Sequence, residues 1–204
     1  DGDCDDSTAS VVPTDSDGDA FSASCDNDCD DSSFSIHPFA DELVQDGIDQ
    51  DCDGGDLDQM VDAGTYHSCA IRTSGIMECW GLNDDGQSSP PDAGYTHVSA
   101  GSYHTCGILS SGDVECWGLN DTGQASAPEG VFTSVSAGSN HTCGILSSGA
   151  VECWGSDSFG QATAPTGIFA SVSVGNNHTC GITVTGSVEC WGRDSSGQSS
   201  PPEL

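Results

Sequence analysis

Residues 98–118 read VSAGSYHTCGILSSGDVECWG, and closely similar stretches begin at Val61, Val135 and Val172. The four copies follow one another at a constant spacing of 37 residues. A fixed period of this length indicates supersecondary units that stack and bury their apolar faces on one another. The repeats therefore determine the fold of most of the chain. The expected units are residues 61–97, 98–134, 135–171 and 172–204.

Each unit is predicted to contain a β-hairpin. In the second unit, residues 105–109 and 113–117 flank a Ser-Ser-Gly connection whose last position favours a glycine with positive φ. Folding the chain at Ser111 places Cys106 opposite Cys116. Directly opposed cysteines of a non-hydrogen-bonded antiparallel pair lie within disulfide range. The predicted disulfides are Cys69–Cys79, Cys106–Cys116, Cys143–Cys153 and Cys180–Cys190.

The opposite face of each hairpin carries one tryptophan. Because both faces then hold packing residues, each small sheet is expected to lie between two neighbours, as blades do in a propeller. A third strand is expected around residues 132–136, after a proline-containing connection at 124–130. A repeated Gly-Gln in these connections is expected to join neighbouring blades through its side-chain amide. The tryptophans are Trp80, Trp117, Trp154 and Trp191.

The order G-x-x-H-[ST]-C, a glycine turn, [VM]-E-C-W-G and then G-Q with a proline resembles the repeat of the regulator of chromosome condensation superfamily. In its 37-residue form it is most similar to the three-stranded blades of bacterial β-lactamase inhibitory propellers. The resemblance covers residues 61–204 and implies an all-β fold with four propeller-type blades. Such propellers usually close with more blades, so the resemblance implies further blades, or sheet edges covered by another chain or by the amino-terminal region.

Charge and cysteine content restrict the class of protein. The chain has 33 acidic residues, two basic residues and a formal net charge of −31. This excess argues against nucleic acid or an anionic membrane as a direct partner and favours bound cations. Twelve cysteines predict a secreted or cell-surface protein in an oxidising environment. No stretch has the apolar length of a membrane span and none resembles a signal peptide, so we expect a mature or partial secreted product without membrane insertion.

Residues 1–60 are predicted to form a small, loop-rich head. Its aspartates alternate with small residues, as in D-S-D-G-D at 15–19 and D-Q-D-C-D-G at 49–54. This spacing lets a tightly turning backbone direct several oxygen donors at one calcium ion. The segment from Asp49 is not a complete EF-hand, because Met60 stands where the final glutamate would be. A solvated acidic tail is the alternative, and the interposed cysteines and apolar residues disfavour it.

The stretch from Asp15 to Gly54 resembles the Asp/Cys-rich metal-binding motif of secreted bacterial proteins and, more distantly, the thrombospondin calcium repeats. Both imply a chain wrapped around calcium and held by disulfides. Four head cysteines permit three connectivities, of which we favour Cys29–Cys52 with Cys4–Cys25. The candidate calcium ligands from the motif are Asp15, Asp17, Asp19, Asp28, Asp30, Asp31, Asp46, Asp49, Asp51 and Asp53. A shortened copy of the same element adds Asp1, Asp3 and Asp5.

Polar residues that recur once per unit are interpreted as structural. A histidine cluster around a central channel is the metal-binding alternative, but a position repeated in every unit more often packs and hydrogen-bonds a neighbouring backbone. The glutamates also recur in every blade and single out none of them as an active site, so catalysis is not expected. The histidines are His67, His104, His141 and His178, and the glutamates are Glu78, Glu115, Glu152 and Glu189. Three N-glycosylation acceptor patterns occur, at Asn120, Asn140 and Asn177.

We expect an extracellular, calcium-stabilised structural or adhesive protein. It would form a homo-oligomer or filament, because head-to-tail contacts that do not close generate filaments, or it would be a module of a longer chain. The alternative is a protein-binding or inhibitory propeller, whose loops should differ between blades and carry exposed aromatics. The loops are short, polar and nearly alike except at Tyr95, Tyr103 and Phe159. An enzyme ranks last, because no nucleophile, positioned base or open metal site is recognised.

Overall fold

The structure is a computed structural model that describes residues 30, 32–33, 35–36, 60–72 and 75–202. The chain divides into two compact units, Asp1–Gln59 and Met60–Leu204, which are treated separately. The described residues contain no helix with the length and apolar character needed to cross a membrane.

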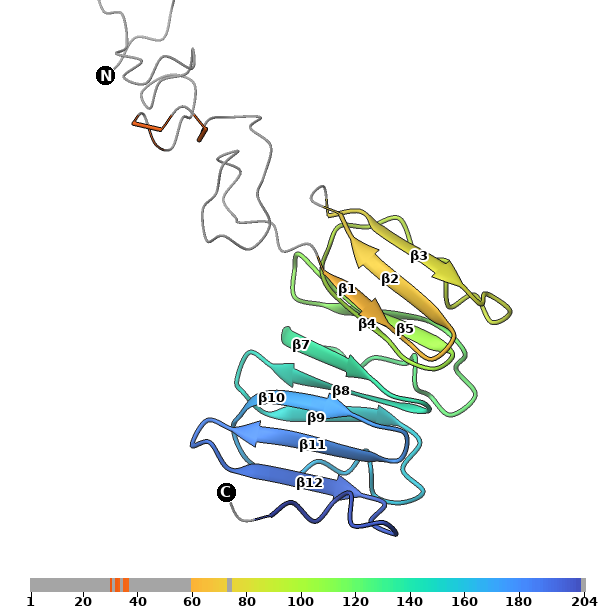
Figure 1. Cartoon of the computed structure of the whole chain (residues 1–204), viewed down its shortest axis with the longest axis vertical. Helices are drawn as coiled ribbons and strands as arrows, with labels where there is room; N and C mark the ends of the chain where they lie inside the picture. Colours follow the sequence, from red (N-terminus) through yellow and green to blue (C-terminus); the bar gives the residue numbers. More distant parts are fainter. Residues whose placement is uncertain (1–29, 31, 34, 37–59, 73–74, 203–204) are drawn as a thin grey trace, which may run out of the picture. The chain divides into compact units, whose positions relative to one another are not determined.

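The described part of the second unit folds into four three-stranded antiparallel sheets, which follow one another as blades in Figure 1. The first blade has the strand order β1-β2-β3, the second β4-β5-β6, the third β7-β8-β9 and the fourth β10-β11-β12. The strands are β1 (Val61–Ala63), β2 (His67–Ile71), β3 (Met77–Gly81), β4 (Tyr95–Ala100), β5 (His104–Leu109), β6 (Val114–Gly118), β7 (Phe132–Ala137), β8 (His141–Leu146), β9 (Val151–Gly155), β10 (Phe169–Val174), β11 (His178–Thr183) and β12 (Val188–Gly192). The predicted all-β fold with four blades is confirmed.

The second and third strands of each blade form the predicted hairpin. In the second blade, Cys106 pairs with Cys116 and Ile108 with Val114, as folding at the Ser-Ser-Gly connection requires. The connection ends at Gly112, whose φ of 88° lies in the left-handed region that glycine adopts without strain. The turn residues and the alternating apolar positions thus specify the same register.

The remaining strand of each sheet precedes its hairpin. β7 pairs with β8, so the strand expected around residues 132–136 exists and belongs to the blade that follows it. Each full blade therefore begins a few residues before the expected repeat boundary, and residues 98, 135 and 172 lie inside β4, β7 and β10. A register shift interrupts the pairing of each of these three strands with the next, which marks a β-bulge.

Each blade contains its predicted cross-strand disulfide. The Cα atoms of the paired cysteines are 4.0 to 4.1 Å apart, with a sequence separation of 10 residues. In the loop-entropy model, closing a loop of this length stabilises the fold by about 2–3 kcal/mol. The disulfides are Cys69–Cys79, Cys106–Cys116, Cys143–Cys153 and Cys180–Cys190.

The hydrophobic core lies between the blades. Cys69, Ile71 and Met77 of the first blade pack against Tyr95 and Val98 of the second. The next contact buries an equivalent set, formed by Cys106, Ile108, Phe132, Val135 and Trp154. Each of the two inner sheets thus packs on both faces, one toward the preceding blade and one toward the following blade.

Aromatic packing explains the glycine in the middle strand of three blades. The ring of Phe132 lies over Gly144, where a Cβ atom would stand 2.6 Å from ring carbon Cδ1. Tyr95 covers Gly107 in the same way, with the corresponding distance 2.5 Å. The first blade has Ala70 at this position, so its outward face differs from those of the other blades.

Candidate functional site

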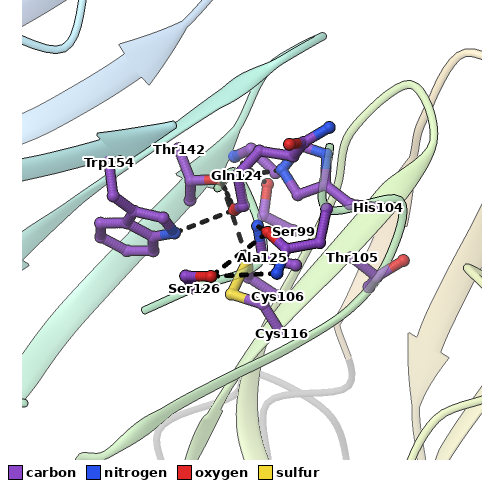
Figure 2. The surroundings of a disulfide bond; sticks show 12 residues. Ser99, His104, Thr105, Cys106, Cys116, Gln124, Ala125, Ser126, Thr142 and Trp154 are labelled. Atoms are coloured by element: carbon purple, nitrogen blue, oxygen red, sulfur yellow. Dashed lines mark hydrogen bonds between the residues drawn. A yellow bond between two sulfur atoms is a disulfide. The ribbon is translucent and has the colours of Figure 1, made fainter. Parts of the chain in front are cut away.

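A buried hydrogen-bond network joins the second and third blades. Nε2 of His104 lies 2.8 Å from Oγ1 of Thr142, and the Thr142 hydroxyl donates to the backbone carbonyl of Gln124 at 3.0 Å. The indole N–H of Trp154 donates to the same carbonyl at 2.9 Å. Figure 2 shows these four residues beside the disulfide of the second blade. We call this arrangement the inter-blade network.

The inter-blade network recurs at the other two contacts, with hydrogen bonds of 2.6 to 3.0 Å. In every case the histidine belongs to the earlier blade, whereas the threonine and tryptophan belong to the later one. The glutamine lies in the loop between them. The sets are His67, Gln87, Thr105 and Trp117 between the first and second blades, and His141, Gln161, Thr179 and Trp191 between the third and fourth.

The network fixes the protonation of its histidines. A threonine hydroxyl has one hydrogen, and Thr142 donates it to the Gln124 carbonyl. The hydroxyl must therefore accept from His104, which carries its proton on Nε2. Nδ1 of His104 is buried and has no partner among the described residues. Burial lowers the pKa values of His104 and His141 to about 4, so both imidazoles are neutral at physiological pH.

Two sequence expectations about this network need correction. The sequence predicts a backbone partner for each repeated imidazole, but in the first three blades the partner is a threonine hydroxyl of the next blade. The sequence also predicts that the glutamine side-chain amide links neighbouring blades, but the backbone carbonyl of the glutamine makes this link. In Gln124, Oε1 instead accepts from the backbone N–H of Thr122 in its own loop, at 2.9 Å. The missed signal was the hydroxyl residue that directly follows every repeated histidine.

The first blade exposes the surface that the later blades bury. We define the amino-terminal face as Val61, Ser68, Ala70 and Trp80. Val61 is 69% exposed and Trp80 is 53% exposed. The residues 37 positions later behave differently: Val98 is 2% exposed and Trp117 is half-buried in the inter-blade network. Among the described residues, no earlier blade covers the amino-terminal face.

The fourth blade exposes the opposite surface. We define the carboxyl-terminal face as His178, Cys180, Ile182 and Gln198. Ile182 is 44% exposed, whereas its equivalents in the first three blades are 3 to 4% exposed. His178 and Gln198 are half-buried, although the corresponding residues of the second and third blades are fully buried. No described residue hydrogen-bonds the imidazole of His178, so this copy of the inter-blade network is incomplete.

A depression of about 410 Å³ lies where the first strands of the four blades end. It is lined by short segments at equivalent positions, and its hydroxyls bond one another. The Ser102 hydroxyl oxygen lies 2.9 Å from that of Thr65 and 3.0 Å from that of Ser139. The lining contains no charged side chain, so the depression offers no carboxylate or imidazole for acid–base chemistry. The segments are residues 63–65, 100–102, 137–139 and 174–176.

The repeated glutamates have different partners in different blades. Glu115 accepts a hydrogen bond from the Tyr95 hydroxyl at 2.8 Å, and burial together with this bond raises the pKa of Tyr95. Glu78 forms an exposed ion pair with Arg72 at 2.5 Å. Throughout the described part of the chain, no three His, Cys, Asp or Glu side chains gather as a metal site would require.

Two exposed aromatic contacts lie on the loops. The rings of Tyr66 and Tyr103 are 5.0 Å apart, and Tyr66 is 51% exposed. A hydrogen bond with Tyr66 raises the pKa of Tyr103. Phe159 is 50% exposed and lies 5.3 Å from the guanidinium carbon of Arg193. These contacts include Tyr103 and Phe159, two of the loop exceptions identified in the sequence.

Most of the predicted metal site lies outside the described residues. Of the candidate ligands only Asp30 is described, and its carboxylate accepts hydrogen bonds from the backbone N–H and hydroxyl of Ser32. The predicted pairs Cys29–Cys52 and Cys4–Cys25 also lie outside. Among the glycosylation candidates, Asn120 is exposed, whereas Asn140 and Asn177 are half-buried.

Both parts of the chain match known protein families. Four segments match the family described as "Regulator of chromosome condensation (RCC1) repeat", at residues 61–87, 95–124, 132–161 and 169–198. They make up more than half of the chain. Residues 3–17 and 28–56 match a family described as "Putative metal-binding motif" and named for copper binding. No curated protein matches the chain.

Solved structures share the fold of the blades. The CRINKLY WD40 ectodomain of the Arabidopsis thaliana receptor kinase ACR4 is 34% identical with a TM-score of 0.55, over 65% of this chain and 48% of that one. The entire ectodomain of the Physcomitrella patens receptor kinase CR4 is 29% identical with a TM-score of 0.58, over 68% and 40%. Yeast RCC1 (Prp20), bound to Kap60, is 16% identical with a TM-score of 0.60, over 75% and 49%. The matches thus cover less than half of each of these chains.

Proposed function

The chain belongs to the Regulator of chromosome condensation (RCC1) repeat family, and we propose that it is an extracellular structural or adhesive module of a larger surface assembly. Its four blades would serve as rigid building elements. The recurrent histidines and tryptophans serve packing and hydrogen bonding between blades, which supports a role without catalysis.

The two exposed end faces carry this proposal. Inside the stack, each blade buries an apolar surface and completes the inter-blade network with its neighbour. At the ends, Val61, Trp80 and Ile182 are 44 to 69% exposed. Exposed apolar side chains at such positions are typical of interaction surfaces, which supports the proposal. An assembly that covers them would gain the burial that the inner blades already have.

The blade disulfides support an extracellular location. All eight described cysteines are paired, as is typical of proteins in oxidising environments. The similar receptor-kinase structures are ectodomains, which agrees with this location. We therefore place the protein outside the cell, either secreted or at the cell surface.

We propose calcium as the metal of the Asp-rich head. The family match supports metal binding in residues 3–17 and 28–56 and is named for copper. The candidate ligands, however, are carboxylates, which suit calcium, whereas copper prefers imidazole and sulfur ligands. Residues 1–60 contain a single histidine, His37, and their cysteines are predicted to be paired. Calcium would offset the concentrated negative charge of this region.

A protein-binding or inhibitory propeller is the second candidate. The Tyr66–Tyr103 pair, in which Tyr66 is exposed and Tyr103 half-buried, supports it, because tyrosines are enriched at binding hot spots. In this case the loops would contact a different protein, and the blades would only position them. The two functions differ in whether the purified chain associates with itself.

Sedimentation velocity and electron microscopy of the full chain test the proposal. The protein would be measured over a range of concentrations, with about 2 mM calcium, which exceeds typical dissociation constants of extracellular calcium modules, and with a chelator. We expect assemblies that grow with protein concentration. A uniformly monomeric species in both conditions would contradict the assembly function and favour the binding function.

A further inference from the structure

We propose that the carboxyl-terminal face of one chain binds the amino-terminal face of a second copy, in the way that each blade binds the next within the chain. The inference rests on the proposed assembly function and specifies its partner and contact. The contact would join the fourth blade of one copy to the first blade of another.

The carboxyl-terminal face offers what each earlier blade offers to its successor. His178 occupies the position of His141, whose Nε2 lies 2.9 Å from the hydroxyl of Thr179 in the next blade. Gln198 occupies the position of Gln161, whose carbonyl accepts from that threonine and from Trp191 at 3.0 Å each. In the described structure, neither the His178 imidazole nor the Gln198 carbonyl has such a partner.

The amino-terminal face offers the complementary groups. Ser68 stands 37 residues before Thr105 and supplies the hydroxyl that the network needs. Trp80 stands 37 residues before Trp117, whose indole N–H donates to the preceding loop carbonyl at 3.0 Å. Trp80 is 53% exposed, and no described residue accepts from its indole. An acceptor for it is present at the other end of the chain.

Joining the two faces would complete the fourth inter-blade network. His178 would donate from Nε2 to Ser68, and the Ser68 hydroxyl and the Trp80 indole would both donate to the Gln198 carbonyl. Ile182 would be covered, as Ile145 is covered at the preceding contact, where it is 4% exposed. An unrelated partner would have to present a hydroxyl, an indole and an apolar surface at this same spacing. A second copy presents them by virtue of its repeat.

The contact should be weaker than the contacts inside the chain. The first blade has Ala70 where the other blades have a glycine beneath an aromatic ring. In the second blade this ring belongs to Tyr95, and the residue 37 positions earlier is Asp58, so the first repeat has no aromatic residue at this position. The net charge of −31 also opposes self-association. We therefore expect an association that depends on protein concentration and on screening by salt.

The two faces differ, so the contact is heterologous. Each copy uses one face toward each neighbour, and the resulting assembly is a ring if the rotation closes and a filament if it does not. Because the two faces differ, each can be blocked separately. A variant with one blocked face can still bind, through its other face, a variant in which the opposite face is blocked.

The test uses Trp80→Glu to block the amino-terminal face and Ile182→Glu to block the carboxyl-terminal face. Both residues are about half exposed, so the substitutions should not disturb the fold, which circular dichroism would verify. Val184→Glu is the matched control. It introduces the same charge at a 62% exposed residue whose equivalents, Ser110 and Ser147, remain exposed inside the stack.

Sedimentation velocity at about 0.15 M salt, where charges are screened beyond roughly 8 Å, would measure each protein and an equimolar mixture of the two blocked variants. We expect the wild type and Val184→Glu to associate alike. Each blocked variant alone should bind itself at least about tenfold more weakly, because a carboxylate would be buried. The mixture should form a one-to-one dimer through the two intact faces.

The outcomes separate this inference from the proposed function. If the wild type assembles and both blocked variants assemble equally well, the contact proposed here is wrong and the assembly function stands. The same conclusion follows if the wild type assembles while the mixture remains monomeric. If the wild type itself stays monomeric at every concentration, the assembly function is wrong and this contact falls with it.

Discussion

Replacing Thr142 with valine should destabilise the blade stack by removing the centre of one inter-blade network. Valine keeps the shape of threonine, so the buried volume is unchanged and the lost hydrogen bonds dominate the effect. Thr142 is fully buried and makes bonds of 2.8 Å with His104 and 3.0 Å with the Gln124 carbonyl. Without the hydroxyl, the Nε2–H of His104 is buried without a partner.

The magnitude follows from which groups lose their partners. A buried donor left unsatisfied costs about 1–3 kcal/mol. The Gln124 carbonyl keeps the Trp154 indole at 2.9 Å, so its loss is smaller. We expect the free energy of unfolding to fall by about 2–3 kcal/mol. For a domain of this size, the melting temperature should fall by about 4–10 °C.

Differential scanning calorimetry of the full, oxidised chain would measure the effect. Thr133→Val is the matched control, because Thr133 is exposed and donates to a backbone carbonyl at 3.2 Å. The control should change the free energy of unfolding by less than about 0.5 kcal/mol. Equal melting temperatures for the two variants would refute the view that the inter-blade network holds the blades together.

Further predictions concern acid, metal and packing. His104 and His141 have folded-state pKa values of about 4, below the ordinary value of 6.5, so their contribution to stability is complete above pH 6.5 and is lost as the pH falls toward 4. His104→Gln should reduce this acid-induced loss by about 3 kcal/mol in denaturant titrations at several pH values, and an unchanged pH dependence would contradict the assignment. Chelation should speed proteolysis of residues 1–60 and leave the blades resistant, whereas identical digestion with and without chelator would exclude calcium stabilisation. Gly144→Ala, which crowds the aromatic ring above it, should destabilise the fold by about 1–3 kcal/mol in thermal unfolding, but Gly94→Ala, with no atom closer than 3.8 Å to the added Cβ, should not.

The sequence specified the hairpins well and the extent of each sheet less well. The pairing of Cys106 with Cys116 follows from the glycine turn and the side-chain alternation, both of which are local. The strand at Phe132–Ala137 lies between two hairpins, and its residues pack in the interface between their blades. Its pairing with the later hairpin depends on how the blades stack, which the local pattern does not encode.

The inter-blade network shows the same limit. His104 and Thr142 are 38 residues apart, and each is recognisable as a repeated position. The sequence alone predicted that the histidine is structural but assigned it a backbone partner. Only the offset between neighbouring blades brings the imidazole of one repeat to the hydroxyl of the next. A hydrogen bond between neighbouring blades can therefore be identified only when the stacking geometry is known.

The end faces explain why function is harder to read than fold in such a repeat. Ile145 and Ile182 are the same residue at the same repeat position, yet one is 4% and the other 44% exposed. The difference arises because the fourth blade packs on Ile145, whereas no described blade packs on Ile182. Residues that form the core inside the stack therefore form the interaction surface at its ends. A repeat that stabilises itself by stacking offers the same stacking surface to a neighbouring copy, so its association and its folding depend on the same side chains.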